Sequence, residues 1–241
     1  MSIPQIATPG TPSEVSPLTV HPRTNSIFHR SDLLFVAGVT SAFIILMSYV
    51  RRRQIDRLDE QIMASFQRLR WQPFARLMWL LSWPGFSPQS RLLPLVIAAA
   101  LWLSGRRRAG LYAITAWGTS VLSRAFKLAV HRPRPSSQRI TIVPAKLDGS
   151  SFPSGHVLAY VGVYGFLHLL ARSGHLPKPL AKPVRWITLL MIFGVGPSRI
   201  YEGHHWPSDV TASYLLGLGY LRLVWRHYLA GASTSTASRR A

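Results

Sequence analysis

The segment SRIYEGHHWPSD at residues 198–209 gathers an arginine, a pair of histidines and a carboxylate within twelve positions. Acidic residues are scarce in this part of the chain, since only three follow Glu60. His205 and Asp209 are four positions apart, so a helix would place them on one face. A carboxylate that holds the proton on one ring nitrogen leaves the other nitrogen free to attack a substrate. The spacing therefore indicates a nucleophilic imidazole that Asp209 orients.

The same spacing also fits a purely structural role for Asp209. Proline and small polar residues favour the first turn of a helix, and a helix that begins at 206–208 would use Asp209 as a capping residue. The segment by itself leaves both interpretations open. Two other parts of the chain favour the catalytic one.

The first of these parts is the sequence PSGH at residues 153–156, which opens a long apolar run. If that run is a helix, Ser154 and Gly155 lie at its N-terminus, where backbone N–H groups and the positive end of the helix dipole bind anions. His156 would then stand beside the bound anion. The segment predicts one wall of an anion site.

The second part supplies positive charge. Lys127 and Arg134, which is followed by a proline, end another apolar run, and Arg199 lies in the segment described above. Guanidinium forks match phosphoryl oxygens two at a time, whereas an ammonium group acts as a point charge. These three cations and the 153–156 segment together predict a cage for a phosphoryl group.

The three patterns resemble the signature motifs of the type 2 phosphatidic acid phosphatase and vanadium haloperoxidase superfamily. They are K-x6-RP at 127–135, PSGH at 153–156 and SR-x5-H-x3-D at 198–209, complete and in order. One departure follows the third motif, because Ser213 stands where the family leads us to expect a glycine. We expect this departure to affect helix packing and not chemistry.

The composition is typical of a membrane protein with anionic partners. The chain has 241 residues, is 48% hydrophobic, carries a formal charge of +20 and lacks cysteine, which excludes disulfide-stapled folds. Its basic residues interrupt apolar runs instead of lining one helix face or an arm, so we expect anionic lipid as the partner and not nucleic acid.

We predict an all-α, polytopic membrane helix bundle between two disordered tails. Residues 1–31 form the first tail, with five prolines in the first 22 positions, and residues 229–241 form the second. The phosphatase domain is expected at 32–228. Its first span, 33–50, has eighteen uncharged residues and would be about 27 Å long as a helix.

Five further apolar runs give about six transmembrane helices in all. They lie near 92–104, 109–128, 156–171, 185–198 and 207–225. Several are short for isolated spans, and we expect their polar ends to belong to the active site. Between the first two spans, apolar residues recur at helical spacing over 55–69, which predicts an amphipathic helix at the membrane interface, followed by a break at Pro84-Gly85.

The basic turns predict the orientation. With both termini inside, the turns near residues 106–108 and 172–185 and the C-terminal arginines face the cytoplasm. The three motifs then face the extracytoplasmic side of the cell membrane. Arg51–Arg53 lie on the opposite side from the one this tendency favours, and three nearby carboxylates offset them in part.

The mechanism follows from the site chemistry, and the resemblance implies the same roles. His205 would attack phosphorus to give a phosphohistidine, Asp209 would orient it, and His156 would protonate the leaving group as a general acid. The phosphoryl oxygens would be held by Lys127, Arg134, Arg199 and the backbone N–H groups near Ser154 and Gly155. No cofactor or metal is required.

Neighbouring residues have plainer interpretations. We expect His204 to be structural because it points away from His205 on a regular backbone. Arg124 and Arg132 are interpreted as solvated residues or headgroup contacts. The tryptophans suit interfacial belts.

Three other functions stay open. Zinc could be bound by His156, His204, His205 and Asp209, although the three nearby cations would repel it. The resemblance also allows a vanadate-dependent haloperoxidase, an activity that it associates with largely soluble proteins. A non-catalytic lipid-binding or transport protein is the third. For the phosphatase, the sequence predicts a phospholipid or polyprenyl phosphate substrate and leaves undecaprenyl diphosphate, phosphatidic acid and phosphatidylglycerol phosphate as candidates.

Overall fold

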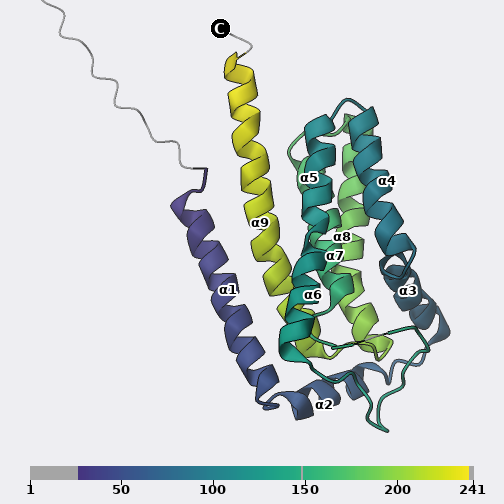
Figure 1. Ribbon diagram of the computed structural model, residues 1–241. Coiled ribbons are helices and arrows are strands. Elements are labelled where there is room, and N and C mark those ends of the chain that lie inside the picture. The colour runs from purple at the N-terminus through teal and green to yellow at the C-terminus, as the bar shows by residue number, and fades with distance from the viewer. Residues whose placement is uncertain (1–26, 148, 239–241) are drawn as a thin grey trace, which may run out of the picture.

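The computed structural model describes residues 27–147 and 149–238, with side chains as far as Gly231. Every regular element in these ranges is helical, so the predicted all-α class is confirmed for them (Figure 1). The helices are α1 (Arg30–Arg51), α2 (Asp56–Phe66), α3 (Gln72–Ser82), the 3-10 turn η1 (Trp83–Gly85), α4 (Gln89–Leu103), α5 (Arg107–Trp117), α6 (Thr119–Val130), α7 (Gly155–Arg172), α8 (Lys178–Tyr201) and α9 (Pro207–Ser238).

Helix α7 is the centre of the bundle. It is apolar on all sides, and a helix of this kind is stable only when other helices surround it. Its neighbours are α5, α6, α8 and α9. Val157, Phe166 and Leu170 are fully buried in the main core cluster. This packing fixes the N-terminus of α7, where the PSGH motif lies.

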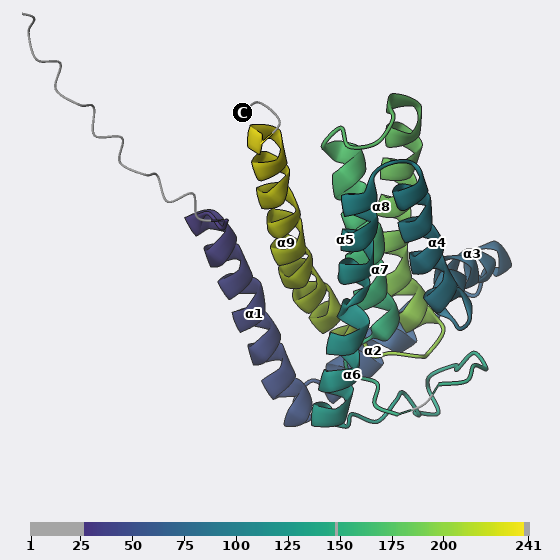
Figure 2. The same cartoon turned by 45° about the horizontal axis from the view of Figure 1, so that its top comes forward.

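Helix α1 packs along α9 at one side of the bundle (Figures 1 and 2). Asp32 of α1 is buried and forms ion pairs with Arg222 and Arg226 of α9. The opposite face of α1 exposes large apolar side chains, including Leu34 and Ile45. Such an exposed apolar face suits contact with lipid.

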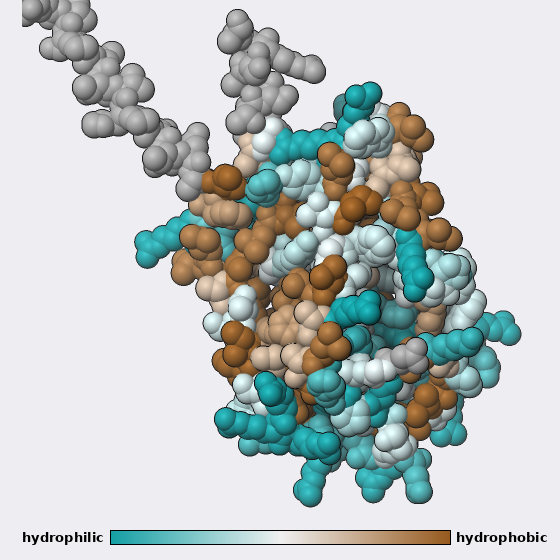
Figure 3. All heavy atoms as spheres, viewed as in Figure 1, coloured by the Kyte–Doolittle hydropathy of each residue, from teal (hydrophilic) through white to brown (hydrophobic). Residues whose placement is uncertain are grey.

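Helix α2 lies across one end of the bundle, below the long helices in Figure 1. The amphipathic helix expected over 55–69 is therefore present at 56–66. Its polar side does not simply face solvent, because Asp59 is buried. Figure 3 shows hydrophilic side chains gathered at this end and hydrophobic ones over much of the helix shafts.

Two predicted spans are interrupted. The run 109–128 forms two helices that meet at Gly118, where the Tyr220 hydroxyl donates to the Thr115 carbonyl and leaves no room for a side chain. The expected break at Pro84-Gly85 is present as η1, and α3 and α4 meet at 66° around it. Among the described helices, α1 alone is long and apolar enough to cross a membrane as one straight helix; α3 and α4 pass the same test as a bent pair.

The predicted tail boundaries differ from the structure. Helix α9 continues to Ser238 through residues 229–238, which were expected to be disordered; the stretch contains no proline that would end the helix. Helix α1 already begins at Arg30, inside the predicted first tail. Residues 1–26 and 239–241 lie outside the described ranges.

Candidate active site

The three motifs meet at the end of the bundle that α2 covers (Figure 1). The first lies at the end of α6 and in the segment that follows, the second at the start of α7, and the third in the turn between α8 and α9. Gly203 makes this turn possible: its φ is +74°, and a side chain there would overlap the backbone of Thr141 and Ile142. The turn delivers His204 and His205 into a buried position.

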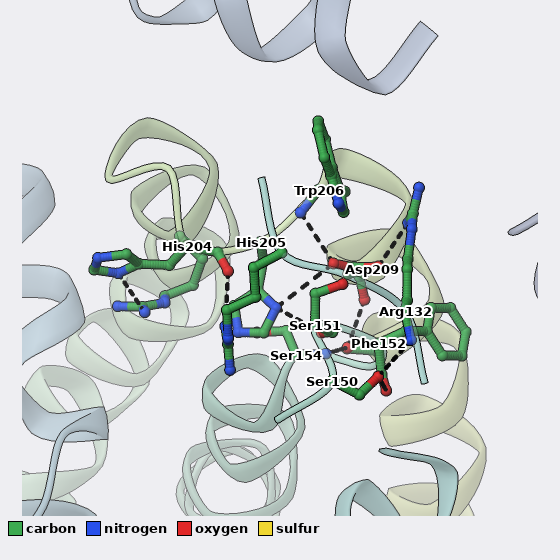
Figure 4. Close-up of polar contacts among 12 residues, drawn as sticks. Arg132, Ser150, Ser151, Phe152, Ser154, His204, His205, Trp206 and Asp209 are labelled. Carbon is green, nitrogen blue, oxygen red and sulfur yellow. Dashed lines mark hydrogen bonds and ion pairs between the residues drawn. The ribbon is translucent and has the colours of Figure 1, made fainter. Parts of the chain in front are cut away.

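The His205 ring faces the Ser151 carbonyl and the Asp209 carboxylate (Figure 4). Its Nδ1 lies 2.7 Å from the Ser151 carbonyl oxygen and 3.6 Å from Asp209 Oδ2. A carbonyl oxygen only accepts hydrogen bonds, so Nδ1 carries the proton and Nε2 has a free lone pair. The sequence predicted that Asp209 would hold this proton; in the structure the Ser151 carbonyl does so, and the carboxylate acts from a longer distance.

Burial and the charges around His205 keep its ring neutral. Burial, and then the positive charges of Arg199, Lys127 and Arg134, lower the pKa of His205 well below its usual range. A lowered pKa favours the unprotonated ring, which is the form that can attack phosphorus. The predicted cations are thus assembled around the predicted nucleophile.

Asp209 caps a helix, as one interpretation predicted, and it also faces His205. Its Oδ2 accepts the backbone N–H of Trp206 at 3.0 Å, which caps the start of α9. The same oxygen faces His205. Asp209 is fully buried, and its Oδ1 accepts a hydrogen bond of 2.7 Å from Arg132.

Arg132 belongs to this cluster, contrary to the interpretation of it as a solvated residue. It is 5% exposed and bonds Ser208 and Asp209 through Nη1, and Asp56 and Asp59 through Nη2. Three of the eight carboxylates in the chain contact this guanidinium, and they lie more than seventy positions away from it, so the sequence alone did not reveal the grouping.

Arg199 is buried and held by protein groups on both Nη atoms. Nη1 donates to Ser82 Oγ and to Glu202 Oε2, the latter at 2.8 Å, and Nη2 lies 2.5 Å from His204 Nδ1. Nε is buried and has no hydrogen-bond partner within the described residues. The sequence suggested that both Nη atoms of Arg199 would bind phosphoryl oxygens. In the structure, Nε is the Arg199 nitrogen left for that role.

The other two predicted cations bond backbone carbonyls near His205. The Lys127 ammonium donates to the Ser150 carbonyl, and Arg134 Nη1 donates to the His204 carbonyl at 2.9 Å. These contacts connect α6 to the residue before Ser151, and the segment after α6 to the residue before His205. The sequence could not predict them, because carbonyl groups of loops carry no residue-specific signal.

The N-terminus of α7 differs from the prediction at one group. The Ser154 N–H, expected to be available to an anion, donates to Ser213 Oγ at 2.7 Å. The Ser213 hydroxyl in turn donates to the Asp209 carbonyl at 2.6 Å. Ser213 thus bonds two of the predicted site residues, in addition to packing in α9. Within the described chain, Ser154 Oγ has no hydrogen-bond partner, and Gly155 is the first residue of α7.

His156 lies against a wall that the sequence did not reveal. The Phe86 ring packs edge-on to it with centroids 4.8 Å apart, and a side chain at Gly85 would overlap the imidazole. His156 Nε2 is buried without a hydrogen-bond partner among the described residues. The break at Pro84-Gly85 therefore shapes the site as well as the helix.

His204 has a structural position. Its Nε2 lies 2.7 Å from the Val143 carbonyl and its Nδ1 faces Arg199, so both ring nitrogens have partners. With both nitrogens engaged, His204 is not available as the zinc ligand that one alternative required. In the described ranges, no group of three or more His, Asp or Glu side chains has the arrangement of a metal site.

Comparison with known proteins adds an independent finding. A family model described as PAP2 superfamily matches residues 108–231, just over half of the chain. Phosphatidylglycerophosphatase B of Bacillus subtilis (strain 168) is 30% identical over 183 residues, which cover 73% of this chain and 86% of that protein. Undecaprenyl-diphosphatase BcrC of the same organism is 32% identical over 131 residues, covering 51% and 61%.

A solved structure shares the fold. It is that of a transmembrane PAP2 type phosphatidylglycerolphosphate phosphatase from Bacillus subtilis, with a TM-score of 0.68 and 26% sequence identity. The match covers 78% of this chain and 93% of that one. The resemblance carried by the three motifs is confirmed, and the chain belongs to the PAP2 superfamily.

Proposed function

We propose that this protein is an integral membrane, metal-independent lipid phosphatase that works through a phosphohistidine at His205. The observation that carries this proposal is the 2.7 Å contact of His205 Nδ1 with the Ser151 carbonyl, which places the ring proton on Nδ1 and leaves the lone pair on Nε2. Ser154 Oγ, His156 Nε2 and Arg199 Nε support it, because buried polar atoms that lack partners in the described chain suit the oxygens of a ligand.

In the proposed reaction, His205 Nε2 bonds to phosphorus while the bond from phosphorus to the leaving oxygen breaks. The leaving group is the lipid alcohol of a monoester or the lipid monophosphate of a diphosphate. His156 gives its proton to that oxygen. In the second step His156 takes a proton from water, the water oxygen bonds to phosphorus, and the N–P bond breaks to release phosphate.

The test is phosphate release by the purified protein in detergent, measured on three lipids with a chelator present. Phosphatidylglycerol phosphate and undecaprenyl diphosphate correspond to the names of the two relatives, and phosphatidic acid is the third candidate. We expect release from at least one of them. No release from any would favour a lipid-binding or transport protein, halide oxidation with vanadate would favour a haloperoxidase, and loss of release with the chelator would favour a metal enzyme.

Removal of His156 should affect substrates according to their leaving groups. We expect His156→Ala to slow lipid hydrolysis by about 10²- to 10⁴-fold, because an alkoxide leaves poorly without a proton. An activated aryl phosphate needs little protonation and should lose far less. The ratio of the two rates, measured on wild type and variant, checks this. Equal losses on both substrates would remove His156 from the role of general acid.

We further propose six spans with the site on the extracytoplasmic side. Helices occupy the six predicted segments, and the turn after α4 lies at the opposite end from the 131–154 segment (Figures 1 and 2). The chain has no cysteine, so a maleimide can label only the single cysteine that a substitution introduces. An impermeant maleimide should label Ser136→Cys in intact cells, and Ser104→Cys only after permeabilisation. The reverse pattern would contradict the orientation.

A further inference from the structure

Helix α2 sends two carboxylates toward the site, from a part of the chain outside all three motifs. Asp59 Oδ2 lies 2.7 Å and Asp56 Oδ1 2.9 Å from Arg132 Nη2. Through its other nitrogen, Arg132 reaches Asp209 Oδ1 at 2.7 Å. A continuous chain of charged contacts thus runs from α2 to the carboxylate beside His205.

Asp59 also fixes the first turn of α9 directly. Its Oδ1 accepts the backbone N–H of Ser208 at 2.8 Å, and its Oδ2 accepts the Ser208 hydroxyl. Arg132 Nη1 donates to the same hydroxyl at 2.7 Å. Ser208 immediately precedes Asp209, so α2 and Arg132 together hold the backbone and the side chain of this turn.

Burying a cluster of charged groups costs desolvation free energy. Asp59 is 1% exposed and Arg132 5%. Burial raises the pKa of the Asp59 carboxyl, and the hydrogen bonds from Ser208 and Arg132 oppose that rise. Desolvation of buried ion pairs commonly outweighs their attraction, so they are poor devices for stability alone. A role in positioning charge explains the arrangement better.

We propose that Asp59, acting through Arg132, positions the Asp209 carboxylate for His205 and preserves its negative charge. This inference rests on the proposed function. Arg132 paired with Asp209 alone would cancel that charge. With Asp56 and Asp59 sharing the guanidinium, Asp209 keeps a net attraction for His205, which becomes positive when it bonds to phosphorus. Asp59 and Arg132 are positioning residues, since they act through Ser208 and Asp209 and have no contact with His205.

The alternative is that α2 simply latches onto α9. If the contact only holds α2 against α9, its loss would destabilise the fold and weaken the binding of every ligand equally. Positioning would affect only states in which His205 bonds to phosphorus or to its analogue. Orthovanadate imitates the five-coordinate transition state, whereas inorganic phosphate occupies the cage without that bond. The two anions therefore separate the two roles without any need for turnover.

The experiment compares full-length wild type with Asp59→Asn in detergent. Asparagine keeps an acceptor for the Ser208 N–H and removes the charge. We expect kcat on the lipid substrate to fall by about 10- to 100-fold with KM within about twofold, because the cage is intact. Calorimetry should show vanadate binding weakened by a similar factor and phosphate binding unchanged. The melting temperature reports folding.

Two neighbours on α2 serve as graded controls. Asp56→Asn should have a smaller effect, because Asp56 is the more exposed partner of Arg132. Glu60→Gln should leave all values within about twofold of wild type, since Glu60 contacts Ser137 and not Arg132. If Asp59→Asn does not fold, Arg132→Lys replaces it; its ammonium cannot span Asp59 and Asp209 as the fork does, and we expect the same losses.

The measurements distinguish a positioning role of Asp59 from a purely structural one. Folded Asp59→Asn and Arg132→Lys with wild-type kcat and vanadate affinity would overturn the proposal. So would equal loss of vanadate and phosphate binding with a lowered melting temperature, which indicates a latch. If wild type released no phosphate yet bound vanadate more tightly than phosphate, and Asp59→Asn removed that difference, the positioning role would stand and the phosphatase proposal would fall. Wild type that binds vanadate no better than phosphate would overturn both.

Discussion

His205→Ala should abolish lipid phosphate release, with a fall in kcat on the order of 10⁶-fold, as for loss of the nucleophile in other covalent enzymes. The structure supplies the reason. Nδ1 is held by the Ser151 carbonyl, so Nε2 is a fixed and unprotonated nucleophile. His204 cannot replace it, because both of its ring nitrogens have partners. Initial rates on the lipid that wild type hydrolyses fastest provide the measurement.

A covalent trap gives the same prediction a second readout. Wild type quenched during turnover of ³²P-labelled substrate should carry an acid-labile label, and His205→Ala should carry none. His168→Ala is the matched control, because His168 faces Thr188 elsewhere in the bundle and should retain both turnover and label. Turnover by His205→Ala near the wild-type rate would remove His205 from the mechanism.

The part of this site that sequence could predict is the part made by neighbours along the chain. His205 and Asp209 lie four positions apart, and local geometry brought them within reach of each other. The group that fixes the tautomer is the Ser151 carbonyl, which lies 54 positions away and is a backbone atom. Backbone groups leave no trace in a sequence, so this contact needed the structure.

Side chains from distant helices account for the remaining errors. Backbone N–H groups at a helix N-terminus lack partners within the helix, so the Ser154 N–H was expected to be available. In the structure it donates to Ser213 of α9. Periodicity predicted α2, but it could not tell that Asp59 faces Arg132 and not water. Acidic residues are scarce around Asp209, but three of them lie within residues 56–60, so scarcity did not single out Asp59.

The membrane assignment shows the same limit at the level of helices. Helix α1 contains none of the three motifs and meets the requirements for a span by itself. The run 109–128 does not, because it is interrupted at Gly118 and ends at Lys127 in the site. Hydropathy identifies a span well where a helix only crosses the bilayer. It identifies a span poorly where the ends of the helix carry polar active-site residues, because these shorten the apolar run.

Arg199→Ala should weaken catalysis and vanadate inhibition together, each by about 10²- to 10³-fold, the usual loss for one donor to a transition-state oxygen. Vanadate adopts the five-coordinate geometry of phosphorus under attack, so a cage built for that state should bind it more tightly than phosphate. Both Nη atoms of Arg199 are committed to protein partners, and the buried Nε is the donor left for an equatorial oxygen.

The design must allow for the ion pair that Arg199 forms. Removing the guanidinium leaves Glu202 buried without its partner, which costs about 3–5 kcal/mol and threatens folding. The double variant Arg199→Ala/Glu202→Gln keeps the cluster neutral, and Arg185→Ala tests loss of an exposed arginine from the same helix. Turnover and the vanadate inhibition constant are measured for each. If the double variant folds and loses turnover while vanadate inhibits it as it does wild type, Arg199 acts on substrate entry and does not hold the phosphoryl group.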